Sequence, residues 1–369
     1  LQVSNFSKRM KMKHSISCYH LLITCLLVCL ISLLSCSDDD VSTNPNDKLS
    51  FTENSFTFDT VFSTVGSTTG TIKVYNNNKD ALIISSIYLA GGANSPFKLN
   101  VSGVSSATQS FSDVFIRAKD SLYIFVQITV NPSNENSPVF IQDSIVFIVN
   151  GNTQYYLLQA YGQDVVILRN FTILNDTTLL NTKPYLIYGD LTVAENKTLT
   201  IEKGSVLYFH KNAGLVVHGN LNAIGTFNKP IIFRADRLDK IEDEPYDAYS
   251  GQWNGIKLTS QTAIHQLDYV NIRNAVHGID CWCGESSKPQ LTILNSSIHN
   301  FDSCGIFAKN VNLTLINTQL SNCGEYCLKI QGGEFSIIHS TIANFYKKIN
   351  RRKIAVIISN YEEDASKLY

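Results

Sequence analysis

Segment 235–253 combines acidic and aromatic side chains in one short stretch of the sequence. Its carboxylates and rings are Asp236, Asp239, Glu242, Asp243, Glu244, Asp247, Tyr246, Tyr249 and Trp253. Carboxylate oxygens are the ligands that Ca²⁺ prefers, and aromatic rings offer flat apolar faces to sugar rings. The segment is therefore a candidate ligand- or glycan-binding site, with Ca²⁺ as its candidate cofactor. The competing interpretation is a solvated charged loop whose Trp253 packs onto neighbouring β-structure.

Catalysis would require carboxylates that converge on one point. A polysaccharide lyase needs them to hold Ca²⁺ beside a Lys or Arg base, and a glycoside hydrolase needs two or three around one glycosidic oxygen. Between Leu258 and Asn344 acidic residues are scarce, and Asp280 and Asp302 lie at poorly matched positions of the chain. We therefore expect a binding protein and keep a lyase or hydrolase with its site at 235–253 as the alternative.

An eleven-residue phrase occurs three times in the C-terminal half at a constant spacing. Its copies begin at Leu291, Leu313 and Phe335, 22 residues apart, and a looser copy occupies 267–274. A fixed period in the low twenties predicts a solenoid in which each repeat is one coil. The copies are rich in Thr, Ile, Val and Phe and lack helical periodicity, which favours a right-handed parallel β-helix over leucine-rich repeats.

Asparagines recur at fixed positions of these copies. The first column is Asn274, Asn300, Asn322 and Asn344, and a second contains Asn295, Asn317 and His339. Asn tolerates the left-handed backbone conformation at a tight corner, and stacked amides can hydrogen-bond from coil to coil. We interpret the first column as a structural Asn ladder rather than as ligand contacts.

Two cysteines lie about one coil apart. Cys304 and Cys327 are separated by 23 residues, so their stacking would bring their Cα atoms to ~5 Å, within disulfide range. Buried reduced thiols are the alternative. The Cys281–Cys283 and Cys323–Cys327 spacings differ from the usual zinc pair, so no metal is assigned to them.

The first half of the chain has a different pattern. Residues 49–163 alternate apolar and polar side chains in about seven short runs separated by turns, which predicts an immunoglobulin-like β-sandwich. This span contains no Cys or Trp, so it lacks the core of antibody domains. We expect 164–183 to be a linker and 184–369 to be the β-helix, which makes the chain all-β.

The N-terminal residues predict export. Basic side chains precede an apolar run at 21–34 that is too short to span a membrane. The run ends in Leu33-Leu34-Ser35-Cys36, which resembles a bacterial lipobox and implies a signal peptide at 1–35 with lipidation of Cys36. Residues 36–48 are expected to be a polar tether. Its Ser37-Asp38-Asp39-Asp40 start resembles the signal that sends Bacteroidetes lipoproteins to the outer face of the outer membrane.

Processing also changes the charge of the chain. Four of the 30 Lys and Arg residues precede Cys36 and none of the 31 Asp and Glu residues does, so the mature chain carries a net charge of −5. No basic stripe remains for nucleic acid. The expected partners are the membrane, through the lipid anchor, and a polysaccharide or a surface protein.

Several phrases together resemble a family of Bacteroidetes surface lipoproteins described as right-handed parallel β-helix repeat proteins. They lie at 183–193, 199–225, 230–239, 251–256 and 340–345. The resemblance implies a pectate-lyase-like fold and a cell-surface location, and it implies no settled activity. The N-terminal domain is similar to the abnormal-spindle/hydin-like immunoglobulin modules of such proteins. Family members continue for several more coils, so the solenoid is expected to be C-terminally truncated.

The sequence thus predicts a surface-anchored lipoprotein that presents its β-helix as a glycan- or protein-binding module. A structural spacer or assembly scaffold is a further alternative. Four Asp-Ser/Thr tripeptides resemble the O-glycosylation motif of Bacteroidetes, with acceptors at Thr60, Ser121, Ser144 and Thr177. A glycan needs an exposed acceptor, so these are candidate modification sites.

Overall fold

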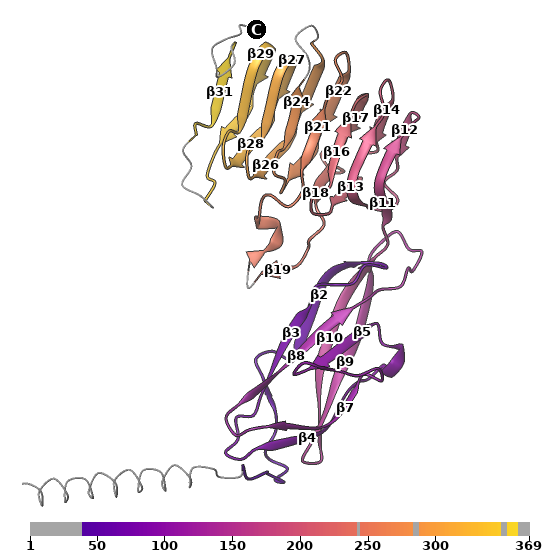
Figure 1. Cartoon of the computed structure of the whole chain (residues 1–369), viewed down its shortest axis with the longest axis vertical. Coiled ribbons are helices and arrows are strands. Elements are labelled where there is room, and N and C mark those ends of the chain that lie inside the picture. Colours follow the sequence, from indigo (N-terminus) through magenta and orange to yellow (C-terminus); the bar gives the residue numbers. More distant parts are fainter. Residues whose placement is uncertain (1–38, 242–243, 283–287, 348–352, 361–369) are drawn as a thin grey trace, which may run out of the picture.

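The computed structural model describes residues 39–241, 244–282, 288–347 and 353–360. These residues form two all-β domains, one above the other in Figure 1, which confirms the predicted fold class. Their only helical segments are two short 3₁₀ turns, η1 (Gly92–Asn94) and η2 (Tyr246–Ala248). No helix in the described part of the chain is long and apolar enough to cross a membrane.

The N-terminal domain is a sandwich of two five-stranded sheets. In order, the first sheet contains β1 (Ser50–Phe51), β3 (Gly70–Tyr75), β8 (Ser121–Ile128), β5 (Phe97–Val101) and β6 (Val104–Ser105), and the second contains β2 (Ser55–Phe62), β10 (Asn152–Gln163), β9 (Val139–Val149), β4 (Leu82–Leu89) and β7 (Ser110–Ile116). Strand β8 alternates buried and exposed residues along its length, as the sequence pattern predicts. Its buried Ile124 packs in a core that includes Phe97 and Phe147.

The segment expected to be a tether packs against this sandwich. Val41 forms a bridge with Ala81, and the Asn150 amide donates to the Asn44 carbonyl oxygen at 3.1 Å. The Ser42 hydroxyl donates to Asp47 at 2.5 Å. Residues 41–48 are therefore an ordered strap on the sandwich rather than a free linker.

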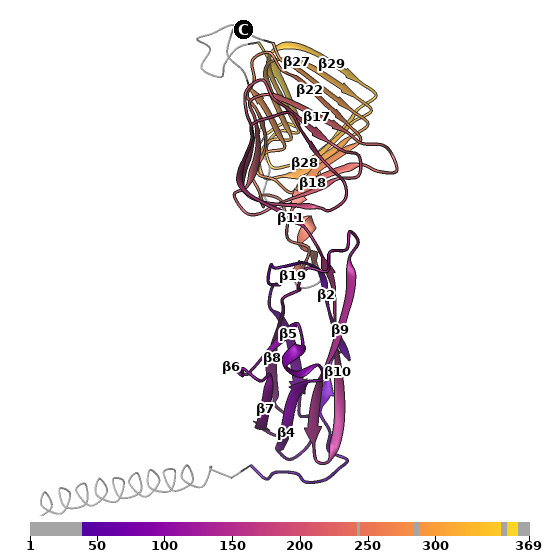
Figure 2. The ribbon, with the colours of Figure 1, turned by 90° about the vertical axis from the view of Figure 1, so that its right-hand side faces the viewer.

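The C-terminal domain is a parallel β-solenoid of about seven turns. Its strands are β11 (Val166–Ile173), β12 (Thr177–Leu179), β13 (Tyr185–Val193), β14 (Thr198–Ile201), β15 (Val206–Phe209), β16 (Gly214–Val217), β17 (Asn220–Ile224), β18 (Ile231–Ala235), β21 (Gly255–Leu258), β22 (Ile264–Asp268), β23 (Val270–Arg273), β24 (Ile279–Trp282), β25 (Gln290–Leu294), β26 (Ser297–Phe301), β27 (Ile306–Ile316), β28 (Gln319–Cys323), β29 (Leu328–Ile338), β30 (Thr341–Ala343) and β31 (Val356–Ser359). Figures 1 and 2 show these strands stacked in parallel rows around one interior.

The rows form three faces. Face A stacks β16, β21, β24, the first part of β27, the first part of β29, and β31. Face B stacks β14, β17, β22, β25 and the second parts of β27 and β29. Face C stacks β15, β18, β23, β26, β28 and β30.

The 22-residue period is the stacking register. Leu291 pairs with Leu313, and Leu313 pairs with Phe335. Leu291 and Leu313 are buried in a single interior cluster that runs through the solenoid from Ile173 to Ile330. Because each coil places the same residue above its predecessor, the periodic apolar positions form one continuous core.

The first coil begins earlier than the sequence suggests. The expected linker, 164–183, contains β11 and β12, and β11 pairs in parallel with β13 from Val166 opposite Tyr185. Strand β11 is mostly exposed, so it lacks the alternating pattern by which a strand is recognised. Its pairing with the next coil makes it a strand.

The domains meet at Asp164. Its carboxylate accepts hydrogen bonds from the Ser63 hydroxyl, from the Asn134 backbone N–H at 2.8 Å and from the Lys183 ammonium at 3.3 Å. The Ser63 bond is the main reason why the pKa of Asp164 is lowered. Near this point Phe62 of β2 packs on Tyr208 of β15, with ring centroids 4.8 Å apart.

Candidate functional site

Segment 235–253 leaves face C at the end of β18 and forms a small hairpin of β19 (Lys240–Ile241) and β20 (Glu244–Pro245), followed by η2. In Figure 1 this loop extends toward the sandwich. Glu244 is exposed, whereas Glu242 and Asp243 lie outside the described residues. The loop therefore interrupts the coils as predicted.

Its described carboxylates bind separate partners. Asp236 contacts His210, with Oδ2 2.6 Å from Nδ1, and Asp239 accepts from Arg237 Nε at 2.9 Å. Asp247 bridges two arginines, because its Oδ1 lies 3.0 Å from Arg234 Nη2 and 3.0 Å from Arg273 Nε. The described residues contain no group of three His, Cys, Asp or Glu side chains arranged to hold a metal. The loop carboxylates thus neutralise neighbouring cations instead of converging.

The loop aromatics do not form an exposed platform. Tyr246 and Tyr249 are half-buried, and the Arg237 guanidinium lies 3.6 Å from the Tyr246 ring centroid. Trp253 is 1% exposed and stacks on Phe209 with centroids 4.1 Å apart. The assignment of Trp253 to a sugar-binding surface is therefore wrong, since its ring is part of the solenoid core.

A titratable column lies at the base of this loop. Arg169, Tyr188 and His210 follow one another at the ends of β11, β13 and β15, and Asp236 follows β18. The guanidinium lies 4.2 Å from the Tyr188 ring centroid, and the Tyr188 and His210 rings are 4.6 Å apart. Burial raises the pKa of Asp236, and the His210 contact opposes that rise. The partner of Asp236 is therefore a histidine rather than a metal.

The described cysteines form no disulfide. Cys281, Cys304, Cys323 and Cys327 are buried thiols, and Cys283 and Cys36 lie outside the described residues. The expected Cys304–Cys327 bridge is wrong because Ile306 pairs with Leu328, so Cys327 lies above Gly305. Burial raises the pKa of Cys304, and a hydrogen bond with Cys327 raises that of Cys323. These thiols are therefore held in the neutral form.

The two Asn columns have different roles. In the expected ladder, Asn274, Asn300 and Asn322 adopt positive φ angles of 69°, 67° and 55°, as corner residues do. Their amides, however, bond to main-chain groups: Asn274 donates to the Asp247 carbonyl oxygen, and Asn322 accepts from the Phe345 N–H. The Asn344 amide likewise donates to the Cys323 carbonyl oxygen at 2.8 Å. This column caps corners and does not form an amide chain.

The second column contains the amide chain. Asn317 donates to Asn295 Oδ1 at 2.8 Å, and Asn295 donates to Asp268 Oδ1 at 2.9 Å. Asn295, Asn317 and His339 have φ angles of 47°, 50° and 50°. Their side chains mark the corner where face B turns into face C.

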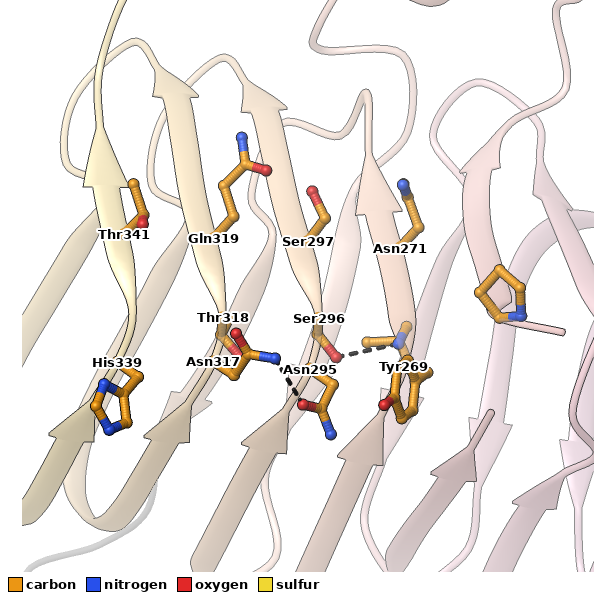
Figure 3. A pocket seen from close by; sticks show the side chains of 12 residues that line it. Tyr269, Asn271, Asn295, Ser296, Ser297, Asn317, Thr318, Gln319, His339 and Thr341 are labelled. Atoms are coloured by element: carbon orange, nitrogen blue, oxygen red, sulfur yellow. Dashed lines mark hydrogen bonds between the residues drawn. The ribbon is translucent and has the colours of Figure 1, made fainter. Parts of the chain in front are cut away.

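A groove of about 350 Å³ lies along this corner. Figure 3 shows its two rows of side chains, one at the corner and one on the outer side of face C. Its lining consists of Pro230, Tyr269, Val270, Asn271, Asn295, Ser296, Ser297, Asn317, Thr318, Gln319, His339 and Thr341. We call it the corner groove.

The corner groove offers amides and hydroxyls in a repeating order. Asn271, Ser297, Gln319 and Thr341 occupy matching positions on successive coils. Stacked strands place these groups ~4.8 Å apart along the groove. The residues that the structure gives as its lining include no Asp, Glu, Lys or Arg. The groove can therefore form many neutral hydrogen bonds, and its lining supplies no carboxylate for acid–base chemistry.

Sequence reasoning did not identify this groove, although the signal was present. The Asn295, Asn317 and His339 register is visible in the sequence, but it was interpreted as structural. The outward residues Ser297, Gln319 and Thr341 also recur every 22 residues. A polar residue that repeats once per coil at an outward position is the feature that could have located the groove.

The four candidate O-glycosylation acceptors lie in strands and are half-buried. At Thr60, Ser121 and Ser144 the backbone N–H donates to the preceding Asp carboxylate, at 2.8, 2.7 and 2.7 Å. At Thr177 the hydroxyl donates to the Asn175 carbonyl oxygen at 2.8 Å. Modification of these residues remains a prediction.

Comparisons with known proteins show no family. No family model matches the chain. A segment of 54 residues is 47% identical to the Drosophila melanogaster Protein bark beetle, which covers 15% of this chain and 2% of that protein. The chain therefore spans a very small part of the curated relative that it matches.

Two solved structures align at low similarity. A PapD-like domain of human CEP192 aligns at 12% identity and a TM-score of 0.22, covering 33% of this chain and 91% of that one. A family 123 glycoside hydrolase from Clostridium perfringens aligns at 8% identity and a TM-score of 0.22, covering 31% and 25%. Scores this low carry no functional argument.

Proposed function

We propose that this protein is a surface-anchored lipoprotein whose β-solenoid binds a neutral glycan in the corner groove. One observation carries the proposal: amide and hydroxyl groups repeat along an open groove without charged side chains in its described lining. Glycans present many hydroxyls, each of which needs a donor or an acceptor when it leaves water. Repeating groups ~4.8 Å apart can engage successive sugar units of an extended chain.

Binding is favoured over cleavage by the chemistry of both candidate regions. The corner groove lacks paired carboxylates, and glycoside hydrolysis requires them. In the 235–253 loop, Asp236, Asp239 and Asp247 are each occupied by His or Arg partners. A lyase or hydrolase centred on this loop is therefore not supported by a converging set.

The architecture suits presentation at a surface. Residues 41–48 pack on the sandwich, so lipidated Cys36 would hold that domain within a few residues of the membrane. The solenoid lies at the opposite end of the sandwich from this N-terminal strap (Figure 1). The sandwich would then raise the corner groove away from the lipid.

A glycan array tests the proposed ligand. The probe is the chain from 36 to 369 with Cys36→Ser, applied to neutral plant, fungal and bacterial polysaccharides. The groove variant Ser297→Ala/Gln319→Ala/Thr341→Ala should lose its array signals by about tenfold or more, because several hydrogen bonds are removed together. The matched control is Thr292→Ala/Thr314→Ala on the outer side of face B. Equal binding by the groove variant and the parent would reject the groove as the site.

A separate experiment tests the anchor. The parent chain expressed in a Gram-negative host with lipoprotein processing should partition into detergent, and Cys36→Ala should become soluble. Unchanged membrane association of Cys36→Ala would contradict lipid anchoring. That outcome would leave the glycan proposal standing.

A further inference from the structure

The outer side of face A carries lysines next to aromatic rings. Outward positions on β24, β27 and β29 align as Asp280, Phe307 and Lys329 in one row, and as Trp282 and Lys309 in the other. We define the lysine–aromatic platform as Trp282, Phe307, Lys309 and Lys329, with Lys257 on β21 at its edge. It lies on a different face from the corner groove.

Each ammonium group lies over a ring of the coil before it. Lys309 Nζ is 5.7 Å from the Trp282 ring centroid, and Lys329 Nζ is 5.2 Å from that of Phe307. Lys329 also lies 5.7 Å from the ring of buried Tyr326. Outward residues two apart on a strand and one coil apart in the stack are neighbours, so this pattern follows from the register.

The platform is accessible. Trp282 is 51% exposed, although a large aromatic side chain normally buries most of its area. Phe307, Lys309 and Lys329 are half-buried, and Lys257 is exposed. A flat sheet with an open Trp ring therefore provides a stacking surface that the 235–253 loop lacks.

The described charge on this face is mainly positive. Its outward positions include Lys257, Lys309 and Lys329 against Asp280. His277 Nδ1 lies 3.6 Å from Asp280 Oδ2, and burial raises the pKa of this carboxyl. Glu325 flanks the face and accepts from the Ser303 hydroxyl at 2.9 Å. The combination of cations and rings distinguishes this face from the neutral groove.

We propose that the lysine–aromatic platform binds an anionic polysaccharide bearing carboxylate or sulfate groups. The Trp282 and Phe307 rings stack on apolar sugar faces, and the Lys309 and Lys329 ammonium groups pair with the anions. An ammonium over a ring is held weakly and can turn toward a carboxylate or sulfate, which is a stronger partner. This site does not depend on the corner groove, so either can fail alone.

Affinity electrophoresis of the 36–369 chain with Cys36→Ser tests the platform. The gels contain polygalacturonate for carboxylate, dextran sulfate for sulfate, or dextran as the neutral polymer. The parent should be retarded by one or both anionic polymers, and retardation should fall as salt is raised. Lys309→Gln/Lys329→Gln should weaken the retardation by about tenfold in apparent Kd, because two charge-assisted contacts are lost.

The control has the same change of charge on the other domain. Lys79→Gln/Lys98→Gln alters two exposed sandwich lysines and should retain binding within about twofold. Trp282→Ala separates stacking from charge: its loss of affinity should persist at salt concentrations that remove the lysine effect. A thermal melt confirms folding, and Trp282→Ala alone decides the matter if the lysine variant does not fold.

The proposal is overturned if no anionic polymer retards the parent. It is also overturned if Lys79→Gln/Lys98→Gln weakens binding as much as Lys309→Gln/Lys329→Gln does, or if Trp282→Ala has no effect. Selective retardation by polygalacturonate assigns carboxylate as the anion, and selective retardation by dextran sulfate assigns sulfate. Loss of neutral-glycan signals on the array would reject the corner groove and leave this test unaffected.

Discussion

At the scale of single residues, the buried His265 couples stability to pH. Its side chain is fully buried, and desolvation lowers its pKa from 6.5 to about 4. The unfolded chain therefore binds a proton below pH 6.5 that the folded chain resists until about pH 4, so stability falls across this window. We expect a loss of roughly 2–3 kcal/mol between pH 7 and 4.5 from this group. Urea unfolding of His265→Leu should lack that part of the loss, whereas exposed His339→Gln should retain it.

The two tryptophans provide a second test at this scale. Trp253 is buried against Phe209, and its Nε1 donates to the Arg273 carbonyl oxygen at 2.8 Å, whereas Trp282 is exposed. Trp253→Ala should lower the free energy of unfolding by about 3–5 kcal/mol, as large core truncations do. Trp282→Ala should change it by less than about 0.5 kcal/mol. Denaturation followed by circular dichroism compares them, and similar losses would contradict the core assignment of Trp253.

At the scale of elements, Asp247 attaches the 235–253 loop to the coils. Its carboxylate contacts Arg234 and Arg273, and its carbonyl oxygen accepts from the Asn274 amide at 2.6 Å. Asp247→Asn removes the charge opposite two largely buried arginines and should cost about 1–3 kcal/mol, a figure reduced because the carboxylate is partly exposed. Limited proteolysis should cut the loop faster in this variant. Asp239→Asn, which affects only the Arg237 pair, is the control, and equal rates in both would exclude Asp247 as the attachment point.

At the scale of the whole molecule, Asp164 couples the two domains. It collects bonds from Ser63 and Asn134 of the sandwich and from Lys183 of the solenoid. Asp164→Asn removes the charge that strengthens these bonds and should cost about 1–3 kcal/mol at the junction. Calorimetry should then resolve two transitions where the parent shows one. Asp143→Asn, within the sandwich, should leave the transitions coupled, and a single transition in Asp164→Asn would show that other contacts suffice.

The lowered pKa of Asp164 gives this junction a pH dependence of the opposite kind to that of His265. The carboxylate contributes stability above its ordinary pKa of 3.8, and the contribution is lost as pH falls through its lower folded value. Separation of the two domains is therefore expected at strongly acid pH, below the window in which His265 acts.

The sequence by itself determined what repeats or alternates. The copies at Leu291, Leu313 and Phe335 gave the coil length, and the alternation within 49–163 gave the sandwich. Both follow from a backbone geometry that places equivalent residues in equivalent environments. Asn at a coil corner is equally local, because its left-handed conformation depends on its own side chain.

Tertiary structure decided whatever depends on contacts between non-equivalent positions. Trp253 is buried because the loop returns it to Phe209, and Cys304 misses Cys327 because the register is one residue different from their spacing. Strand β11 exists only through its pairing with β13. The pairing of loop carboxylates with arginines and the corner groove between faces B and C arise in the same way. A single sequence specifies the period of a solenoid, but packing between its coils determines which side chains remain available to a ligand.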